Sequence, residues 1–404
     1  MLDKALKGNQ TYWGWLIFLL ALMGIGFGSY LYQFFEGLRI TGMSRDVSWG
    51  FYIGQLTYFV GVAASGVMVV LPCYLHDYKA FGRITILGEF LAVSAIIMCG
   101  LFVIVDLGNL PRMLNIMIHP NPTSILFWDM IVLNTYLVLN FLIGWNVLSA
   151  ERKGVHYPKW VTPLIYISIP WAFSIHTVTA FLYAGLPGRH FWLTAILAAR
   201  FLSSAFCSGP ALLILLCLII RKVSSFDPGK EQIRTLGVIV AYAMIINVFF
   251  FLLEIFTAFY SQIPGHMHTF QYLFAGLEGH GKLVPLMWTS VAFGIIALVL
   301  LIVPAARRKE GVLAVACASV IISTWIDKGF GLVVGGFIPN PFNRVFEYWP
   351  TTPEVLISVG VWATEYWPTT PEVLISVGVW ATGFFVLTVL YKIVVAVKEE
   401  TAAS

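Results

Sequence analysis

The sequence alternates long apolar runs with short polar connections, and this alternation restricts the possible folds more than any other feature. A membrane-spanning helix needs about 20 apolar residues. Ten runs are long enough, at 13–35, 49–75, 86–108, 124–148, 161–185, 191–220, 235–262, 283–305, 311–337 and 372–397. Hydrophobic residues make up 59% of the chain and charged residues 11%, against roughly 25% charged residues in a soluble domain. We therefore predict an all-α polytopic membrane protein.

Recurring features divide this single membrane domain, residues 1–404, into two groups. Residues 49–185 and 191–337 each hold four runs, and each group opens on a tryptophan followed by a patch of small residues, which allow close helix approach. The second helix of each group ends near an acid, Asp106 or Glu254. We expect two four-helix bundles, flanked by the first run and the tenth.

The sequence also contains an exact 18-residue duplication. Residues 347–364 are repeated as residues 365–382. Eighteen residues make five helical turns, so the copy preserves the helical face. We expect one copy to begin the tenth helix and the other to enlarge the loop at 338–371.

The distribution of basic residues predicts the orientation. Sixteen lysines and arginines lie at one side of the predicted spans, six at the other and two within them. The positive-inside rule then places both termini in the cytoplasm of a bacterial cell, with a multi-pass domain in the inner membrane. The first run has no small-residue cleavage pattern and is read as a retained helix.

Ionisable residues inside a membrane are costly, so they are candidates for function. In this orientation they favour the outer half of the spans, and we expect no comparable set in the inner half. The outer set is Asp106, Asp129, His176, Arg200, Glu254, Asp327 and Lys328, with Arg112 in the loop that follows Asp106.

Two helix faces carry the candidates with the most direct chemistry. His176, Thr179 and Tyr183 share one face and offer an imidazole, a hydroxyl and a phenol, which suits a quinone carbonyl or a proton relay. The alternative is a histidine that only packs between helices. Glu254, with Tyr260 nearby, can exchange a proton or can neutralise Arg200, and both roles are compatible.

The remaining candidates also have structural explanations. Asp106 and Arg112 can pair across their turn or contact a substrate. Asp129 can be an acid favoured at a helix N-terminus. Asp327 and Lys328 are adjacent, point to different sides of a helix and are candidates for a proton path between the bundles.

Several redox sites are disfavoured. Bis-histidine haem needs two facing histidines at membrane depth, and only His176 lies well inside a span. The five cysteines fall in apolar runs and form no CxxC pair, which disfavours iron–sulfur clusters, metal sites and disulfides. Basic residues occur only in short clusters, so we expect no nucleic-acid partner.

Several segments together resemble the NrfD/PsrC family of respiratory membrane subunits. They are residues 106–112 (DLGNLPR), 121–124 (NPTS), Trp128-Asp129, Trp49-Gly50 with Gly61 and Gly66, 169–171 (IPW) and 176–178 (HTV). The last two resemble the ten-helix branch, which includes the DsrP and HmcC proteins of sulfate reducers, the hydrogenase HybB subunits and the quinone-reductase-complex subunit. Within that branch the DsrP proteins are the most similar.

This resemblance implies a haem-free subunit that binds menaquinone near the outer face. It implies a periplasmic ferredoxin-like iron–sulfur subunit and a multihaem cytochrome c as partners, together with further membrane and cytoplasmic subunits. Electrons would pass between the clusters and menaquinone, with proton translocation through the bundles. Two alternatives stay open: a secondary transporter, whose site would lie near the midplane, and a structural anchor for partner subunits.

Overall fold

The computed structural model describes residues 2–349, 351 and 370–403, with side chains over 3–349, 351 and 381–401. Among these residues, ten helices are long and apolar enough to cross a membrane, and no strand occurs. This confirms the predicted fold class. The spanning helices are α1 (Gln10–Glu36), α2 and α3 (Phe51–Ala63 and Ser65–Leu75, one span), α4 (Thr85–Asp106), α6 (Ile125–Arg152), α7 (Val161–Ala184), α8 (Ile196–Val223), α9 (Lys230–Tyr260), α11 (Val284–Ile302), α13 (Glu310–Ile326) and α15 (Thr370–Ala403).

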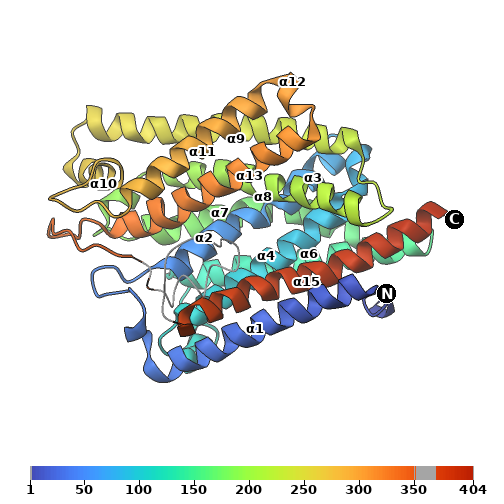
Figure 1. Ribbon diagram of the computed structural model, residues 1–404, viewed down its shortest axis with the longest axis horizontal. Helices are drawn as coiled ribbons and strands as arrows, with labels where there is room; N and C mark the ends of the chain where they lie inside the picture. Colours follow the sequence, from blue (N-terminus) through green and yellow to red (C-terminus); the bar gives the residue numbers. More distant parts are fainter. Residues whose placement is uncertain (1, 350, 352–369, 404) are drawn as a thin grey trace.

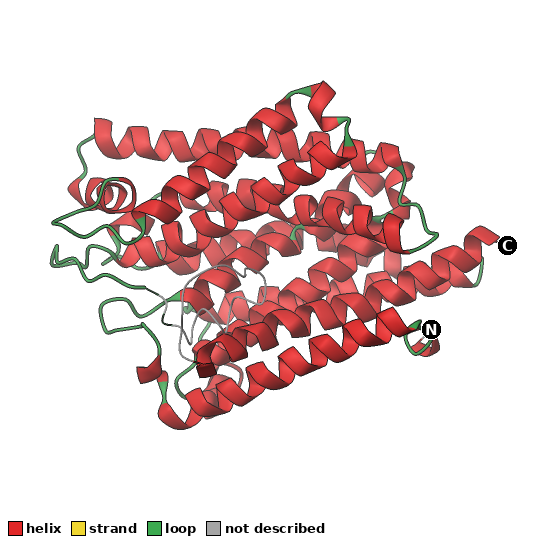
Figure 2. Cartoon of the chain, viewed as in Figure 1, coloured by secondary structure: helices red, strands yellow, loops and turns green. Residues whose placement is uncertain are grey.

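The spanning helices lie roughly alongside one another, and both ends of the chain lie at the same end of the molecule (Figure 1). We call this end the termini side and the other the opposite side. Short helices cap both sides: α12 (Pro304–Arg307) on the termini side, and α5 (Asn115–Ile118) and α10 (Pro264–Phe274) on the opposite side. Figure 2 shows that the connections between helices are short at most places.

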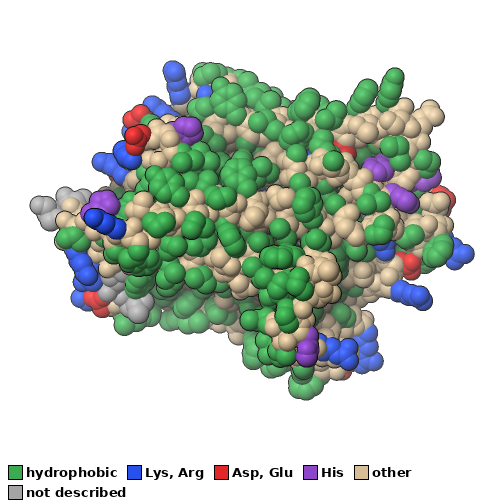
Figure 3. All heavy atoms as spheres, turned by 180° about the vertical axis from the view of Figure 1, so that it is seen from behind, with side chains coloured by type: hydrophobic (Ala, Val, Ile, Leu, Met, Phe, Trp, Pro, Cys, Tyr) green, Lys and Arg blue, Asp and Glu red, His purple; other side chains and the backbone are tan. Residues whose placement is uncertain are grey.

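Hydrophobic side chains cover the flanks of the molecule, while charged side chains gather mainly towards its two ends (Figure 3). Large apolar residues are exposed on several helices, among them Phe27 on α1, Phe256 on α9 and Ile295 on α11. In water such a surface would be costly, because apolar area is driven out of contact with water. The exposed flank therefore fits the hydrocarbon region of a bilayer.

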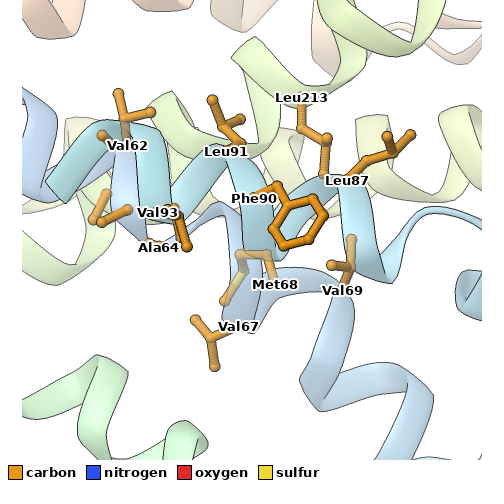
Figure 4. Packing of buried hydrophobic residues seen from close by; sticks show 14 of the residues in the cluster. Val62, Ala64, Val67, Met68, Val69, Leu87, Phe90, Leu91, Val93 and Leu213 are labelled. Carbon is orange, nitrogen blue, oxygen red and sulfur yellow. The ribbon is translucent and has the colours of Figure 1, made fainter. Parts of the chain in front are cut away.

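Helix α2 lies at the centre of the core. All of its residues are buried, because α4, α8 and the segment that continues α13 pack around it. Figure 4 shows Phe90 and Leu91 of α4 beside Met68 of α3 and Leu213 of α8, so the two four-run groups share one hydrophobic core. In a bilayer such packing is held by close van der Waals contact rather than by exclusion of water.

The backbones of this core approach closely at Gly209 of α8. A Cβ atom at Gly209 would lie 2.8 Å from the Ser65 backbone nitrogen and 2.9 Å from the Val62 carbonyl oxygen. Both atoms belong to the place where α2 gives way to α3 at Ala64. Only glycine fits there without a backbone shift.

We expect Gly209→Ala to destabilise the protein by about 1–3 kcal/mol, because the added methyl group meets backbone atoms that cannot rotate away. All five cysteines are free and buried, so a thiol-reactive dye can report unfolding of the detergent-solubilised protein. The matched control is Gly24→Ala in α1, where an added Cβ meets no atom within 4 Å. Equal melting temperatures for the two variants would contradict the prediction.

The end of the ninth span is not regular α-helix. From Asp327 to Val334 the chain forms a π-helix, and Gly335–Phe337 adds a 3-10 turn. The wider π-helical turn rotates the side chains that follow, and π-helical turns are frequent at functional sites. Here the irregular segment carries two of the candidate residues, Asp327 and Lys328.

The duplicated segment is described only in part. Helix α15 begins at Thr370, inside the second copy. Most of the first copy, and its expected place in the loop at 338–371, lies outside the described residues. From Ala381 on, α15 packs beside α1 and α4.

Candidate functional site

Three ionisable side chains meet inside the second group of helices. The Arg200 guanidinium in α8 donates to the carboxylate of Glu254 in α9, and its other amine group lies 3.0 and 3.2 Å from the two carboxylate oxygens of Asp327. We call Arg200, Glu254 and Asp327 the ion triad. The neutralisation of Arg200 by Glu254, one of the two roles expected for that acid, is present, and Asp327 joins the pair.

The ion triad is shielded to different degrees. The side chains of Arg200 and Glu254 are 7% and 3% exposed, and that of Asp327 is 20% exposed. The ring of Phe251 covers the guanidinium, with its centroid 5.4 Å from the Arg200 Cζ. Asp327 is thus the member that a ligand can reach most easily.

A second polar cluster lies in the first group of helices. The Thr179 hydroxyl in α7 donates to the Asp129 carboxylate in α6 at 2.6 Å, and both side chains are buried. One turn further along α7, the Tyr183 and Thr57 hydroxyls are 2.5 Å apart, which connects α7 to α2. Asp129 therefore has a specific partner on the predicted histidine face, beyond any interaction with the N-terminus of its own helix.

His176 lies on the same face of α7 and is fully buried. Neither of its ring nitrogens has a hydrogen-bond partner among the described residues. A buried polar group without a partner costs about 1–3 kcal/mol. Structural needs therefore do not account for a histidine here, while a ligand or a transferred proton would.

Lys328 follows Asp327 in the chain and approaches α8 at Phe201, whose ring centroid is 5.7 Å from that of Tyr183. Its amine is 3.5 Å from the Phe201 carbonyl oxygen and 4.8 Å from the centroid of the Phe201 ring, and the side chain is 3% exposed. A Cβ atom at Gly61 would meet the amine at 3.0 Å and the Ser208 hydroxyl at 3.2 Å, so Lys328 reaches across α8 to α2. The adjacent residues Asp327 and Lys328 have separate partners, as expected.

Two other predicted residues, Tyr260 and Arg112, lie on the surface. Tyr260 is 78% exposed. The expectation that Tyr260 lies beside Glu254 is therefore wrong: it is six residues along, and about 240° of helical rotation turns it to the outer surface. Arg112 is exposed in the turn Leu110–Leu114, and Asp106 is the last residue of α4.

The half of the membrane on the termini side, where no comparable set was expected, holds a buried acid that was not among the candidates from the sequence. Glu89 lies four residues from the start of α4 and is 2% exposed. One of its carboxylate oxygens has no hydrogen-bond partner among the described residues. The signal for Glu89 in the sequence is its place three residues inside the apolar run 86–108, which also holds Asp106.

Two buried glutamines were missed as well. The Gln33 amide in α1 donates to the Val105 carbonyl at 2.6 Å and accepts from the Tyr52 hydroxyl at 2.7 Å. The Gln55 carbonyl in α2 accepts from the Trp325 indole at 2.9 Å. These bonds link α1 to α2 and α4, and α2 to α13, because a buried amide must find its partners inside the protein.

A cavity of about 500 Å³ opens between the two groups of helices. Its walls come from α2, α4, α8, α11, α13 and α15, and are almost entirely apolar. Trp325 and Ile326 line it and directly precede Asp327 of the ion triad. Neither His176 nor Glu254 lines this cavity.

Comparison with known proteins gives consistent matches. The family model described as "Polysulphide reductase, NrfD" matches residues 39–338. A Halobacterium salinarum protein provisionally assigned as a membrane subunit of dimethyl sulfoxide reductase is 26% identical over 86% of this chain and 87% of its own length. The Archaeoglobus fulgidus Hdr-like menaquinol oxidoreductase integral membrane subunit is 25% identical over 72% and 71%. The integral membrane subunit of the Nitratidesulfovibrio vulgaris menaquinone reductase is 21% identical over 85% and 86%.

Proposed function

Because the chain belongs to the NrfD (polysulphide reductase) family of integral membrane proteins, we propose that it is the quinone-reactive membrane subunit of a multi-subunit oxidoreductase. Two relatives are named for menaquinol or menaquinone chemistry, and all three are named as membrane subunits. The buried ionisable side chains in the half of the bundle on the opposite side carry the proposal, since such groups are costly in a membrane without a task.

The finer assignment follows the same reasoning. We propose menaquinone as the substrate, a periplasmic ferredoxin-like iron–sulfur subunit as electron partner and a multihaem cytochrome c among the other subunits, as in the DsrP-like members of the ten-helix branch. The excess of basic residues on the termini side supports a bacterial cytoplasmic membrane with both termini in the cytoplasm. The clusters then lie in the periplasmic half, near the proposed electron partner.

In the proposed reaction, this chain supplies the groups that bind and release protons. Quinone reduction consumes two electrons and two protons, and the electrons come from the partner subunits. In the ion triad two carboxyl groups share one guanidinium. Counting only these contacting groups, the charges balance when one carboxyl carries a proton, so the triad is suited to hold and release one.

The second cluster offers a separate set of proton-exchanging groups. Asp129 is held by Thr179, and the unpartnered ring of His176 lies one turn from Thr179 on the same helix. Lys328 follows Asp327 of the ion triad and lies beside Phe201, whose ring packs against that of Tyr183 in the second cluster. We propose that protons move among these groups, and that Glu89 on the termini side is the entry point if protons cross the membrane.

The test is quinol turnover by the complex purified through a tag on this chain. We expect menaquinol-dependent activity from the intact complex. Partner subunits purified from a strain lacking this chain should lose that activity and keep activity with a water-soluble viologen dye, which bypasses the membrane. Unchanged menaquinol turnover without this chain would overturn the proposal.

One observation favours a structural anchor as the second candidate. Both carboxyl groups of the ion triad are paired with Arg200, and the large cavity is not lined by His176 or Glu254. An anchor would keep partner subunits at the membrane without contacting quinone. It predicts that the purified complex assembles but that replacement of His176 leaves quinol turnover unchanged.

A further inference from the structure

The apolar cavity between the two groups of helices has features of a specific binding site. It runs along α13 from Ala318 to Ile326, eight residues or about 12 Å at the helical rise. On its rim, Thr289 of α11 is exposed, so the cavity opens towards the lipid-facing surface. An elongated cavity that opens towards the lipid suits a molecule with a long hydrocarbon chain that enters from the bilayer.

The polar atoms of the lining are largely occupied. The Ser94 hydroxyl donates to the Phe90 carbonyl, the Thr289 hydroxyl donates to the Pro285 carbonyl and the Trp325 indole donates to Gln55. The Tyr58 hydroxyl has no partner among the described residues. One hydroxyl is too little to recognise a polar head group, so the occupant of the cavity is hydrocarbon.

The depth of the cavity restricts which part of a membrane lipid can enter it: a phospholipid can insert only an acyl chain while its head group stays at the membrane surface. Ala318 lies eight residues, about 12 Å, from the start of α13 on the termini side, and α4 contributes Leu91 to Met98 near its own middle. The cavity is therefore in the central part of the membrane. The charged head group of a phospholipid is strongly disfavoured at that depth, whereas the neutral ring of a quinone is not.

The end of the cavity near the opposite side lies one residue along the chain from the ion triad, whose members do not themselves line it. Ile326 lines the cavity, and Asp327 is the next residue and the most exposed member of the triad. A molecule with a neutral head at Asp327 and a long apolar tail would fill the hollow along α13. We propose that the cavity receives the polyprenyl tail of the quinone, an inference that rests on the proposed function.

The experiment compares two quinols that share one head group. Long-tailed menaquinol and menadiol, which has no prenyl tail, are supplied to the purified complex carrying Ala318→Leu. The larger side chain fills part of the cavity, so the ratio of kcat/KM for menaquinol to kcat/KM for menadiol should fall about tenfold, as expected when a pocket rejects added methylene groups. The matched control is Ala314→Leu, the same change one turn away on α13 and outside the lining.

The outcomes separate this inference from the proposed function. An unchanged ratio in Ala318→Leu, with wild-type menaquinol turnover intact, would overturn the tail site and leave the proposed function standing. A fall of the same size in Ala314→Leu would also overturn it, because the effect would not depend on the cavity. Absence of any quinol turnover by the wild-type complex would overturn both.

Discussion

Arg200→Met is expected to lower the free energy of unfolding by about 3–5 kcal/mol, because it leaves buried carboxyl groups without their cation. Glu254 and Asp327 both pair with the Arg200 guanidinium, and Glu254 is almost fully shielded. Methionine has a similar length and no charge, so the loss comes from the ion pairs and only slightly from packing. The thiol-reactive dye should report a clear fall in melting temperature, with the five buried cysteines as reporters.

The triple variant Arg200→Met, Glu254→Gln, Asp327→Asn provides the control. It removes all three charges together, so most of the stability should return, since buried ion networks replaced by neutral side chains are often no less stable. Arg200→Lys should recover only part, because an ammonium group cannot bridge two carboxylates in the planar manner of a guanidinium. An Arg200→Met protein as stable as the wild type would show that the triad does not hold α8, α9 and α13 together.

His176→Leu is expected to reduce menaquinol turnover at least about 100-fold, in the range lost when a positioned acid–base group is removed. The same substitution should leave the melting temperature unchanged or raise it. Both ring nitrogens lack partners among the described residues, so leucine removes a buried polar cost of about 1–3 kcal/mol and breaks no hydrogen bond. The opposite directions of the two readouts separate a functional histidine from a packing residue.

Thr177→Val on the same helix is the matched control. The Thr177 hydroxyl donates to the Phe173 carbonyl of its own helix, and valine preserves the shape of the side chain. Turnover should stay within about twofold of the wild type, because loss of a hydroxyl that bonds only to its own helix has little effect on the rest of the protein. Normal menaquinol turnover in His176→Leu would remove His176 from the site and favour the structural anchor.

The length of the apolar runs was enough to predict the spanning helices. A run of about 20 apolar residues that crosses a membrane must form a helix, because each backbone polar group must find its hydrogen-bond partner within the segment. Local departures were not predictable in this way. The break at Ala64 and the π-helix from Asp327 depend on which helix lies opposite, and α10 falls in a segment predicted to be a connection.

The depth of each candidate side chain in the membrane could be predicted from the sequence. The direction in which each side chain points from its helix could not. Counting residues along each span placed Arg200 and Glu254 at a similar level, and the structure joins them. The rotation of each helix decides which side chains face inward, and an almost uniformly apolar helix such as α9 gives little indication of it. For this reason the sequence did not show that Tyr260 faces outward or that Asp327 pairs with Arg200.

The packing of α1 has a consequence for biogenesis. Its main neighbour is α15, which follows more than 300 residues later in the chain. The first helix therefore enters the bilayer long before its principal contact surface has been synthesised. Until translation ends, α1 can be held only by partners made early, such as the hydrogen bonds of the Gln33 amide with Val105 of α4 and Tyr52 of α2. Truncation just before Thr370 should thus yield a protein in which α1 lacks its main contact surface, α15. The final packing of α1 therefore depends on completion of the chain.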